Sequence, residues 1–213
     1  MNYINHDSVL RTLRALVPER RLGYVESLHI AELQANRLLE IFAVRGPLVP
    51  SQLITELPRF DVRLDADLPV SGSTHWENGR WIITLNANEP YTRRRYSLAH
   101  EFKHAIDHTT KAFLYGDTMN DPRAAERAER AADHFAACLL MPKRWLKSQW
   151  VMTQNVPLLA HSLGVSSRAL SVRLWHLGMA VDTPRCPRIS RPDEWPGTVD
   201  YYLRYTPMRL EAA

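Results

Sequence analysis

One short segment, residues 100–104, carries side chains that could bind a metal ion and activate water. It reads His-Glu-Phe-Lys-His, so two histidines lie four residues apart and a glutamate follows the first. On an α-helix this spacing places both imidazoles on one face, about 6 Å apart along the axis. Zinc accepts imidazole nitrogen and keeps one position for water in catalytic sites. We therefore predict that His100 and His104 bind zinc and that Glu101 takes a proton from water.

A third ligand is expected from a later helical segment. Glu129 and Asp133 lie four residues apart there, the spacing with which Glu-zincins such as thermolysin supply a third metal ligand and a carboxylate that hydrogen-bonds a ligand histidine. This interpretation assigns Glu129 to the metal and Asp133 to one imidazole. Glu126 is a competing ligand, or it forms a solvated ion pair with Arg130. A site of two histidines and one carboxylate also accepts Mn2+ or Fe2+ in other settings.

Three other histidines are weaker candidates. His108 lies one turn beyond His104, too far along a straight helix to share the ion, so we expect it in the core or at the wall of a cleft. His75, on a predicted strand, and His134, next to Asp133, could stabilise an oxyanion, but packing or surface roles are expected for both.

Turn residues and periodicity place the metal candidates on two helices. The first is expected to run from a cap at Asn88, with Pro90 in its first turn, to about Thr109. The second begins at Asp121 and ends before Pro142. Further helical patterns cover residues 28–42, 50–57 and 157–178.

The segments before the first of these two helices alternate between apolar and polar side chains, as β-strands do. Three strands, mostly antiparallel, are expected over residues 60–65, 71–76 and 81–85. Asn78-Gly79, between the last two, predicts a tight hairpin because a type I′ turn needs positive φ at both central residues. The hairpin places Trp76 opposite Trp81.

The composition fits one folded domain with at most a small addition. Of 213 residues, 45% are hydrophobic and 23% are charged, which excludes disorder throughout. No apolar run approaches the roughly 20 residues of a membrane-spanning helix, and residues 1–14 lack the apolar core of a signal peptide. Cys138 and Cys186 form no CxxC pair. We therefore expect a cytoplasmic, reduced protein, whose net charge of +4 is compatible with nucleic acid but does not require it.

The two helical segments resemble those of one enzyme family. RRRYSLAHEFKHAIDH (residues 93–108) is similar to the zinc-binding helix of the ImmA/IrrE metallo-endopeptidases, and ERAADHFAACLLMP (residues 129–142) resembles their third-ligand helix. The similarity covers roughly residues 31–180. Lys103 stands where the family usually has Gly, which places a cation beside the site or at its rim. Asp133 stands where the family usually has Asn and should keep its hydrogen-bonding role.

The resemblance implies an α+β, zincin-like peptidase core with a small, mostly antiparallel sheet and a helical C-terminal subdomain. The expected parts are an N-terminal helical extension (1–30), the core (31–142), a helix-turn-helix-like subdomain (143–183) and an extended tail (184–213). It also implies a cytoplasmic zinc endopeptidase that cuts a helix-turn-helix repressor, encoded nearby on a mobile element or in a stress response. The alternative function is a non-catalytic, metal-stabilised regulator that binds a repressor or DNA.

In zincin folds, a sheet edge beside the metal binds substrate as an added strand. The residues expected to do this are Ser71, Gly72, Ser73, Thr74 and His75. An ordinary edge strand is the plainer interpretation of the same segment.

The spacing of Ala160, Gly164 and Leu170 is typical of a helix-turn-helix. Arg168, Arg173 and His176 would then lie on or near the outer face of its second helix, while Trp175 and Leu177 need burial. Packing on the peptidase or docking of a repressor is favoured over direct reading of DNA.

Overall fold

The structure of the protein, a computed structural model, describes residues 7–116 and 122–179. The predicted tail, residues 184–213, lies outside the described residues, as does Cys186. The division of the chain at residues 30, 142 and 183 stays a prediction. None of the helices in the described ranges is long and apolar enough to cross a membrane.

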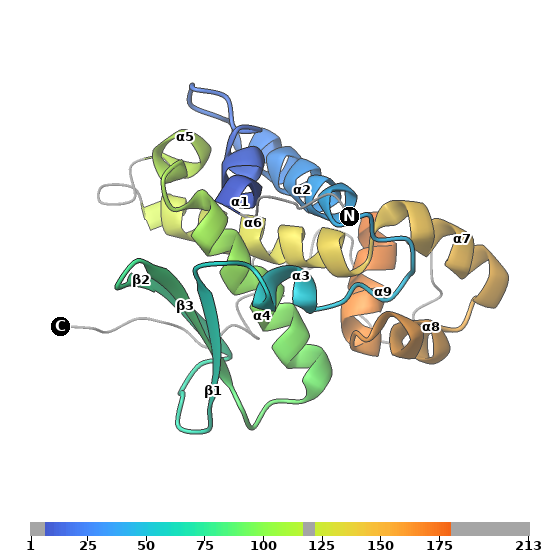
Figure 1. Ribbon diagram of the computed structural model, residues 1–213. Helices are drawn as coiled ribbons and strands as arrows, with labels where there is room; N and C mark the ends of the chain where they lie inside the picture. Colours follow the sequence, from blue (N-terminus) through green and yellow to red (C-terminus); the bar gives the residue numbers. More distant parts are fainter. Residues whose placement is uncertain (1–6, 117–121, 180–213) are drawn as a thin grey trace.

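The described residues form helices around one small sheet, so the expected α+β fold class is confirmed (Figure 1). In chain order the elements are α1 (Asp7–Arg14), α2 (Tyr24–Ile41), α3 (Gln52–Thr55), β1 (Phe60–Asp65), β2 (Gly72–Glu77), β3 (Arg80–Asn86), α4 (Tyr91–Asp107), α5 (Lys111–Tyr115), α6 (Pro122–Leu140), α7 (Lys143–Thr153), α8 (Val156–Leu163) and α9 (Ser167–His176). Pro90, not Asn88, caps α4.

The sheet has the strand order β1-β3-β2. The predicted hairpin is confirmed: β2 pairs with β3 antiparallel, and Trp76 lies opposite Trp81 with their rings 5.3 Å apart. The expectation of a mostly antiparallel sheet is wrong, because β1 pairs with β3 in parallel. After β1 the chain skips the neighbouring position and forms β2 at the opposite edge of the sheet. The hairpin then brings β3 back between β1 and β2, where it runs in the same direction as β1.

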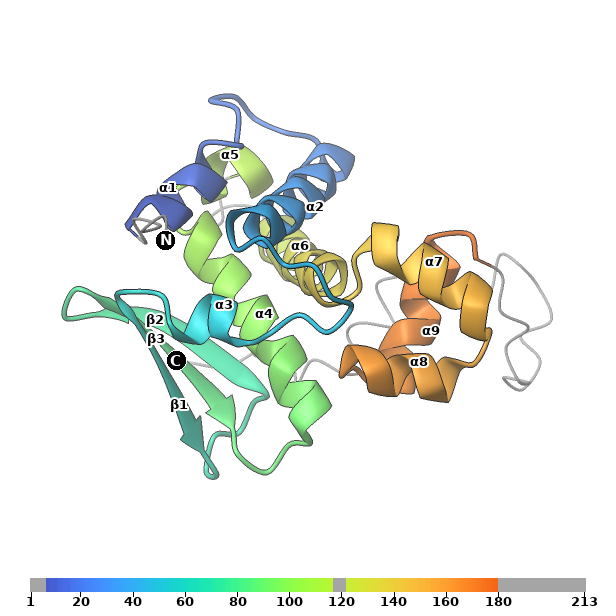
Figure 2. The same cartoon turned by 45° about the vertical axis from the view of Figure 1, so that its right-hand side comes forward.

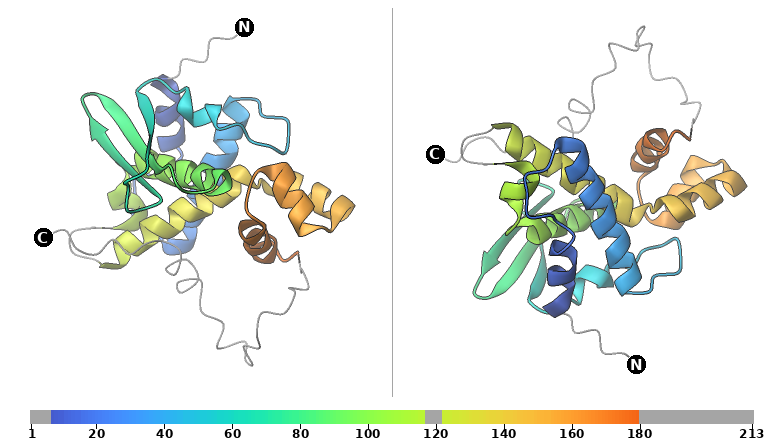
Figure 3. Two further views of the ribbon diagram at one scale, coloured as in Figure 1. Left: turned by 90° about the horizontal axis from the view of Figure 1, so that it is seen from below. Right: turned by 90° about the horizontal axis from the view of Figure 1, so that it is seen from above.

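Helix α4 lies at the centre of the molecule, between the sheet on one side and α6 on the other, and α6 in turn packs against α2 (Figure 3). Phe102 of α4 is fully buried and contacts the rings of Phe60 and Phe135 at 5.3 and 6.2 Å. Where α6 packs against α4 and α2, it carries small buried residues, among them Ala131, Ala132 and Ala136. Such side chains let neighbouring helices approach closely.

The last three helices form a group beside one end of α4 and α6 (Figure 2). Arg95 of α4 joins them to the core, because its buried guanidinium donates hydrogen bonds to the carbonyl oxygens of Leu163 and Gly164, at 3.0 Å each, and of Val49. Residue 164 has a φ of +63°, and any Cβ there would collide with Arg95. A glycine is therefore required at this position.

Two expectations for the helix-turn-helix-like segment are wrong. Arg173 is not on the outer face: it is 3% exposed, and its Nε points to the carbonyl oxygen of Met141. Trp175, in contrast, is 52% exposed. The second helix is rotated from the expected orientation because Leu170 and Leu174, one turn apart, face the core and bring Arg173 with them.

Lys103 does not lie beside the site or at its rim, as expected, but is fully buried. Its ammonium pairs with the carboxylate of Asp107, one turn further along α4, and the hydroxyl of Tyr115 donates a hydrogen bond to the same carboxylate. The carboxylate within reach of position 103 explains the burial, because a charge is tolerated in a protein interior only when it is paired.

We predict that Lys103→Met destabilises the protein by about 3–5 kcal/mol, because Asp107 then remains buried without its counter-ion. Urea unfolding followed by circular dichroism measures the loss. The double variant Lys103→Met, Asp107→Asn should recover part of it. Lys147→Met makes the same exchange at an exposed position of α7 and should change stability by no more than about 0.5 kcal/mol. Equal effects of the two single variants would contradict a paired, buried Lys103.

Candidate metal centre

Helices α4 and α6 bring together the three predicted metal ligands, His100, His104 and Glu129. The Nε2 atoms of the two histidines are 3.1 Å apart. The carboxylate of Glu129 reaches both, with 3.2 Å from Oε2 to Nε2 of His100 and 3.4 Å from Oε1 to Nε2 of His104. Three potential ligand atoms thus lie within 4.8 Å of one another. Two imidazole nitrogens and one carboxylate oxygen form a donor set that suits zinc.

Asp133 lies one turn beyond Glu129 and orients one of the imidazoles. Nδ1 of His100 is 2.9 Å from Oδ1 of Asp133. Donation of the Nδ1 proton to this carboxylate leaves the lone pair on Nε2, the atom that faces Glu129 and His104. Tyr96 holds the same turn of α6, because its hydroxyl donates a hydrogen bond to the backbone carbonyl of Asp133 at 2.8 Å.

The carboxylates of Glu129 and Asp133 stabilise positive charge at this site. Burial alone would lower the pKa of His100, but its hydrogen bonds to Asp133 and Glu129 raise that pKa to about 10. Burial likewise acts to raise the pKa of Glu129, yet hydrogen bonds with His100 and His104 hold it well below its usual range. A divalent cation would be stabilised by the same two anions, so the residues present fit a metal.

Glu101 is buried beside these residues, 8% exposed. Among the residues the structure describes, its carboxylate has no hydrogen bond or ion pair. Strand β2 lies against it: a Cβ on Gly72 would be 2.9 Å from Cγ and 3.1 Å from Oε1 of Glu101. The absence of a side chain at position 72 therefore lets the strand lie directly on this carboxylate, a contact that no local pattern in the sequence could have indicated.

The five residues expected to bind substrate fall in or next to β2, one of the two outer strands of the sheet in the described part of the chain. The hydroxyl of Ser71 donates to Glu89 at 2.6 Å and accepts from Arg93 at 3.1 Å, so it is engaged within the protein. Gly72 and Thr74 lie on the side of α4, whereas Ser73 and His75 alternate to the other face of the sheet. β2 thus has no neighbouring strand along its outer side within residues 7–116 and 122–179.

Other candidates lie away from the three ligand atoms. Glu126 pairs with Arg130 at 2.5 Å, as the alternative interpretation expected. His108 is exposed, so the expectation that it lies in the core is wrong, and its ring lies edge-on to that of the buried Trp81, with centroids 5.1 Å apart. His134 belongs to a second group of potential ligands that the sequence did not reveal, since its members come from helices about 100 residues apart.

We predict that Asp133→Ala weakens metal binding by about 10–100-fold, because His100 then loses the partner that fixes its tautomer. Glu129→Ala should weaken it further, through loss of a ligand. Metal affinity measured by competition with a chelator of known affinity tests both changes. Glu126→Ala is the matched control and should bind as the unchanged protein does; equal losses for Glu126→Ala and Glu129→Ala would speak against Glu129 as the third ligand.

The chain is similar to known proteins in fold and in family. No curated protein matches the sequence significantly, but ten chains of solved structures match in fold. One is a Mycobacterium tuberculosis transcriptional regulator, which is 18% identical and superimposes with a TM-score of 0.57 over 83% of this chain and 53% of that chain. The present chain thus spans about half the length of that structure. The model of the IrrE N-terminal-like domain, Peptidase_M78, matches residues 60–174, more than half of the sequence, and the chain therefore belongs to this peptidase family.

Proposed function

We propose that this protein is a zinc-dependent endopeptidase that cleaves one or a few specific proteins. The observation that carries the proposal is the convergence of His100, His104 and Glu129 on one point, next to the carboxylate of Glu101, which has no hydrogen bond or ion pair with any described residue. Three protein ligands leave one coordination position of zinc for water, and the carboxylate of Glu101 beside them can accept a proton from that water. Membership in the Peptidase_M78 family supports the same reaction class.

The reaction follows from the roles of these side chains. Zinc, when bound, lowers the pKa of water to about 7 and polarises the carbonyl group of the substrate. Glu101 takes the proton from the attacking water and passes it to the nitrogen of the leaving amine. Asp133 keeps the proton of His100 on Nδ1, so that Nε2 stays available as a ligand.

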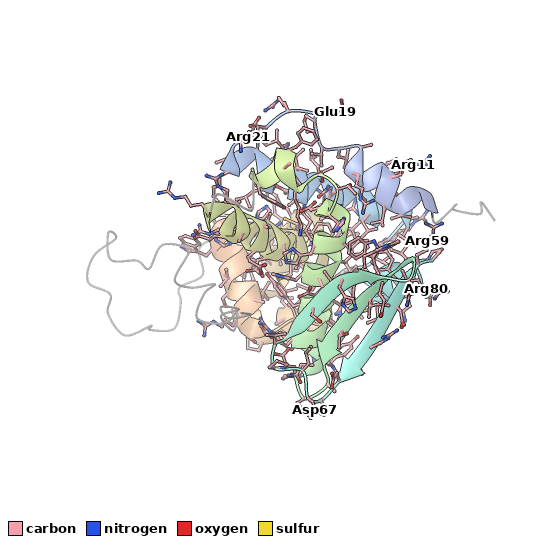
Figure 4. All side chains as sticks on the ribbon, turned by 90° about the vertical axis from the view of Figure 1, so that its left-hand side faces the viewer. Arg11, Glu19, Arg21, Arg59, Asp67 and Arg80 are labelled. Atoms are coloured by element: carbon pink, nitrogen blue, oxygen red, sulfur yellow. The ribbon has the colours of Figure 1, made fainter. Side chains whose placement is uncertain are left out.

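We propose that the substrate binds in an extended conformation along the outer edge of β2, because an edge strand presents unpaired backbone groups. Gly72 brings this edge close to Glu101, and the strand then leads to Trp76. Trp76 lines a groove of about 750 Å³ between α1 and the sheet. Arg11, on α1, and Arg59, before β1, also line this groove and mark that end of the molecule in Figure 4. A substrate that continues past the cleavage site could place acidic or aromatic side chains there.

The proposed target is a helix-turn-helix repressor in the cytoplasm. The fold is shared with a transcriptional regulator, which supports a place in gene regulation. Direct DNA binding through α9 is less favoured, since Arg173 is buried and cannot reach a base or phosphate. Helices α8 and α9 would then pack on the peptidase or dock the target. The alternative function, a non-catalytic regulator, would give no role to the carboxylate of Glu101, which is buried and has no partner in the described part of the chain.

We predict that Glu101→Gln reduces cleavage of the helix-turn-helix repressor encoded by the neighbouring gene by about 10²–10⁴-fold. Metal content should stay unchanged, because only the acceptor of the proton from water is lost. Gel electrophoresis of the repressor and elemental analysis of the variant measure the two properties. Glu126→Gln is the matched control and should cleave normally. Undiminished cleavage by Glu101→Gln would exclude Glu101 as the base, and binding of the repressor without any cleavage by the unchanged protein would favour the non-catalytic regulator.

We predict that Gly72→Ala lowers the cleavage rate at least about 10-fold with metal still bound, because the new methyl group would displace the carboxylate of Glu101. Steady-state cleavage of the same repressor checks this. Gly46→Ala is the control, since a Cβ at position 46 would have no neighbour within 4 Å. If both alanine variants cleave as the unchanged protein does, the contact between β2 and Glu101 has no catalytic importance.

A further inference from the structure

A second group of metal-ligating side chains lies in the seam between α2 and α6. His134 and Cys138 are one turn apart on α6, and Glu32 faces them from α2. One ligand atom from each of the three lies within 4.8 Å of the others. Because 100° separates successive residues of a helix, His134 and Cys138 point away from the face of α6 that carries Glu129. The group therefore shares no ligand with the first centre.

The three side chains are available as ligands. Burial, followed by the charges of Arg173, His176 and Lys103, lowers the pKa of His134 to about 4, so its imidazole is neutral at pH 7 and needs to lose no proton. Within residues 7–116 and 122–179, the side chains of His134 and Glu32 form no hydrogen bond or ion pair. Both are partly exposed, which gives an ion a path from solvent.

Cys138 is the buried member, 1% exposed. Burial raises the pKa of its thiol to about 11, although the neighbouring Arg173 acts in the opposite direction. The thiol is therefore protonated when no metal is bound, and it would lose its proton on coordination, as cysteine ligands do. The thiolate would then lie beside the guanidinium of Arg173, which stabilises negative charge on sulfur.

The charges of an occupied site also balance. A divalent ion, the Cys138 thiolate, the Glu32 carboxylate and a neutral His134 sum to zero, so the nearby Arg173 meets no net positive charge. Lys103, the other buried cation of this region, is already compensated by Asp107. Sulfur, nitrogen and oxygen donors together favour zinc over magnesium or calcium, which prefer oxygen alone.

We propose that Glu32, His134 and Cys138 form a second metal site, which binds zinc with water as its fourth ligand and ties α2 to α6. Neither helix carries the complete ligand set, so an ion binds only when the two are packed together. Binding therefore stabilises the folded chain. The site is independent of the peptidase reaction, because its ligands take no part in the first centre.

Cobalt(II) is the probe that separates the two sites. A thiolate ligand produces an intense sulfur-to-cobalt charge-transfer band in the near ultraviolet, whereas the first centre offers only nitrogen and oxygen. We expect the unchanged 213-residue protein to bind two Co2+ ions per chain and to show this band. His100→Ala, His104→Ala should bind one ion and keep the band, and this outcome does not depend on whether the protein is a peptidase.

Cys138→Ser should bind one ion and lose the band, while Cys186→Ser, the matched exchange at the other cysteine of the chain, should keep it. Glu32→Gln changes a partly exposed residue and tests the site without altering the core; it should weaken the Co2+ titration of the band at least 10-fold. In the variant that lacks the first centre, Zn2+ should raise the melting temperature, and Cys138→Ser should abolish the rise. Absence of the band at excess Co2+, or a band that persists in Cys138→Ser, would overturn the proposal.

Discussion

The close packing of α4 against α6 is the contact on which the candidate metal centre depends. Each helix supplies part of the set: His100 and His104 come from one, Glu129 and Asp133 from the other. The ligand atoms meet only because the helices approach closely, and the small side chains on α6 make that approach sterically possible. A dense interior transmits small changes in helix spacing, so a change in core packing would also change the geometry of the candidate ligands.

Features set by spacing within one element were predictable from the sequence. The pair His100 and His104, the pair Glu129 and Asp133, and the hairpin at Asn78-Gly79 each follow from local periodicity or turn geometry. Such spacing decides which side chains share a face. It does not decide which other element that face will pack against. The expectation that Glu129 approaches the two histidines therefore rested on a family pattern, and the distances of 3.2 and 3.4 Å come from the structure.

Features that arise from contacts between distant segments were not predictable. The parallel pairing of β1 with β3 depends on which side of a hairpin the earlier strand joins. Arg173 is a surface residue by type, yet the orientation of α9 buries it. Gly72 gains its importance from Glu101, and Glu32 joins Cys138 only in the folded chain. In each case the missing information was a tertiary contact that no local pattern encodes.

The buried pair of Lys103 and Asp107 constrains how the chain can diverge. Loss of either charge alone leaves the other without compensation in the interior, whereas exchange of both for apolar residues of similar size removes the difficulty. The two positions are thus coupled in their free energies, and a single substitution passes through a less stable intermediate. Evolution of α4 is therefore expected to proceed at these sites by paired replacement, so that homologues with a small residue at position 103 carry an uncharged one at position 107.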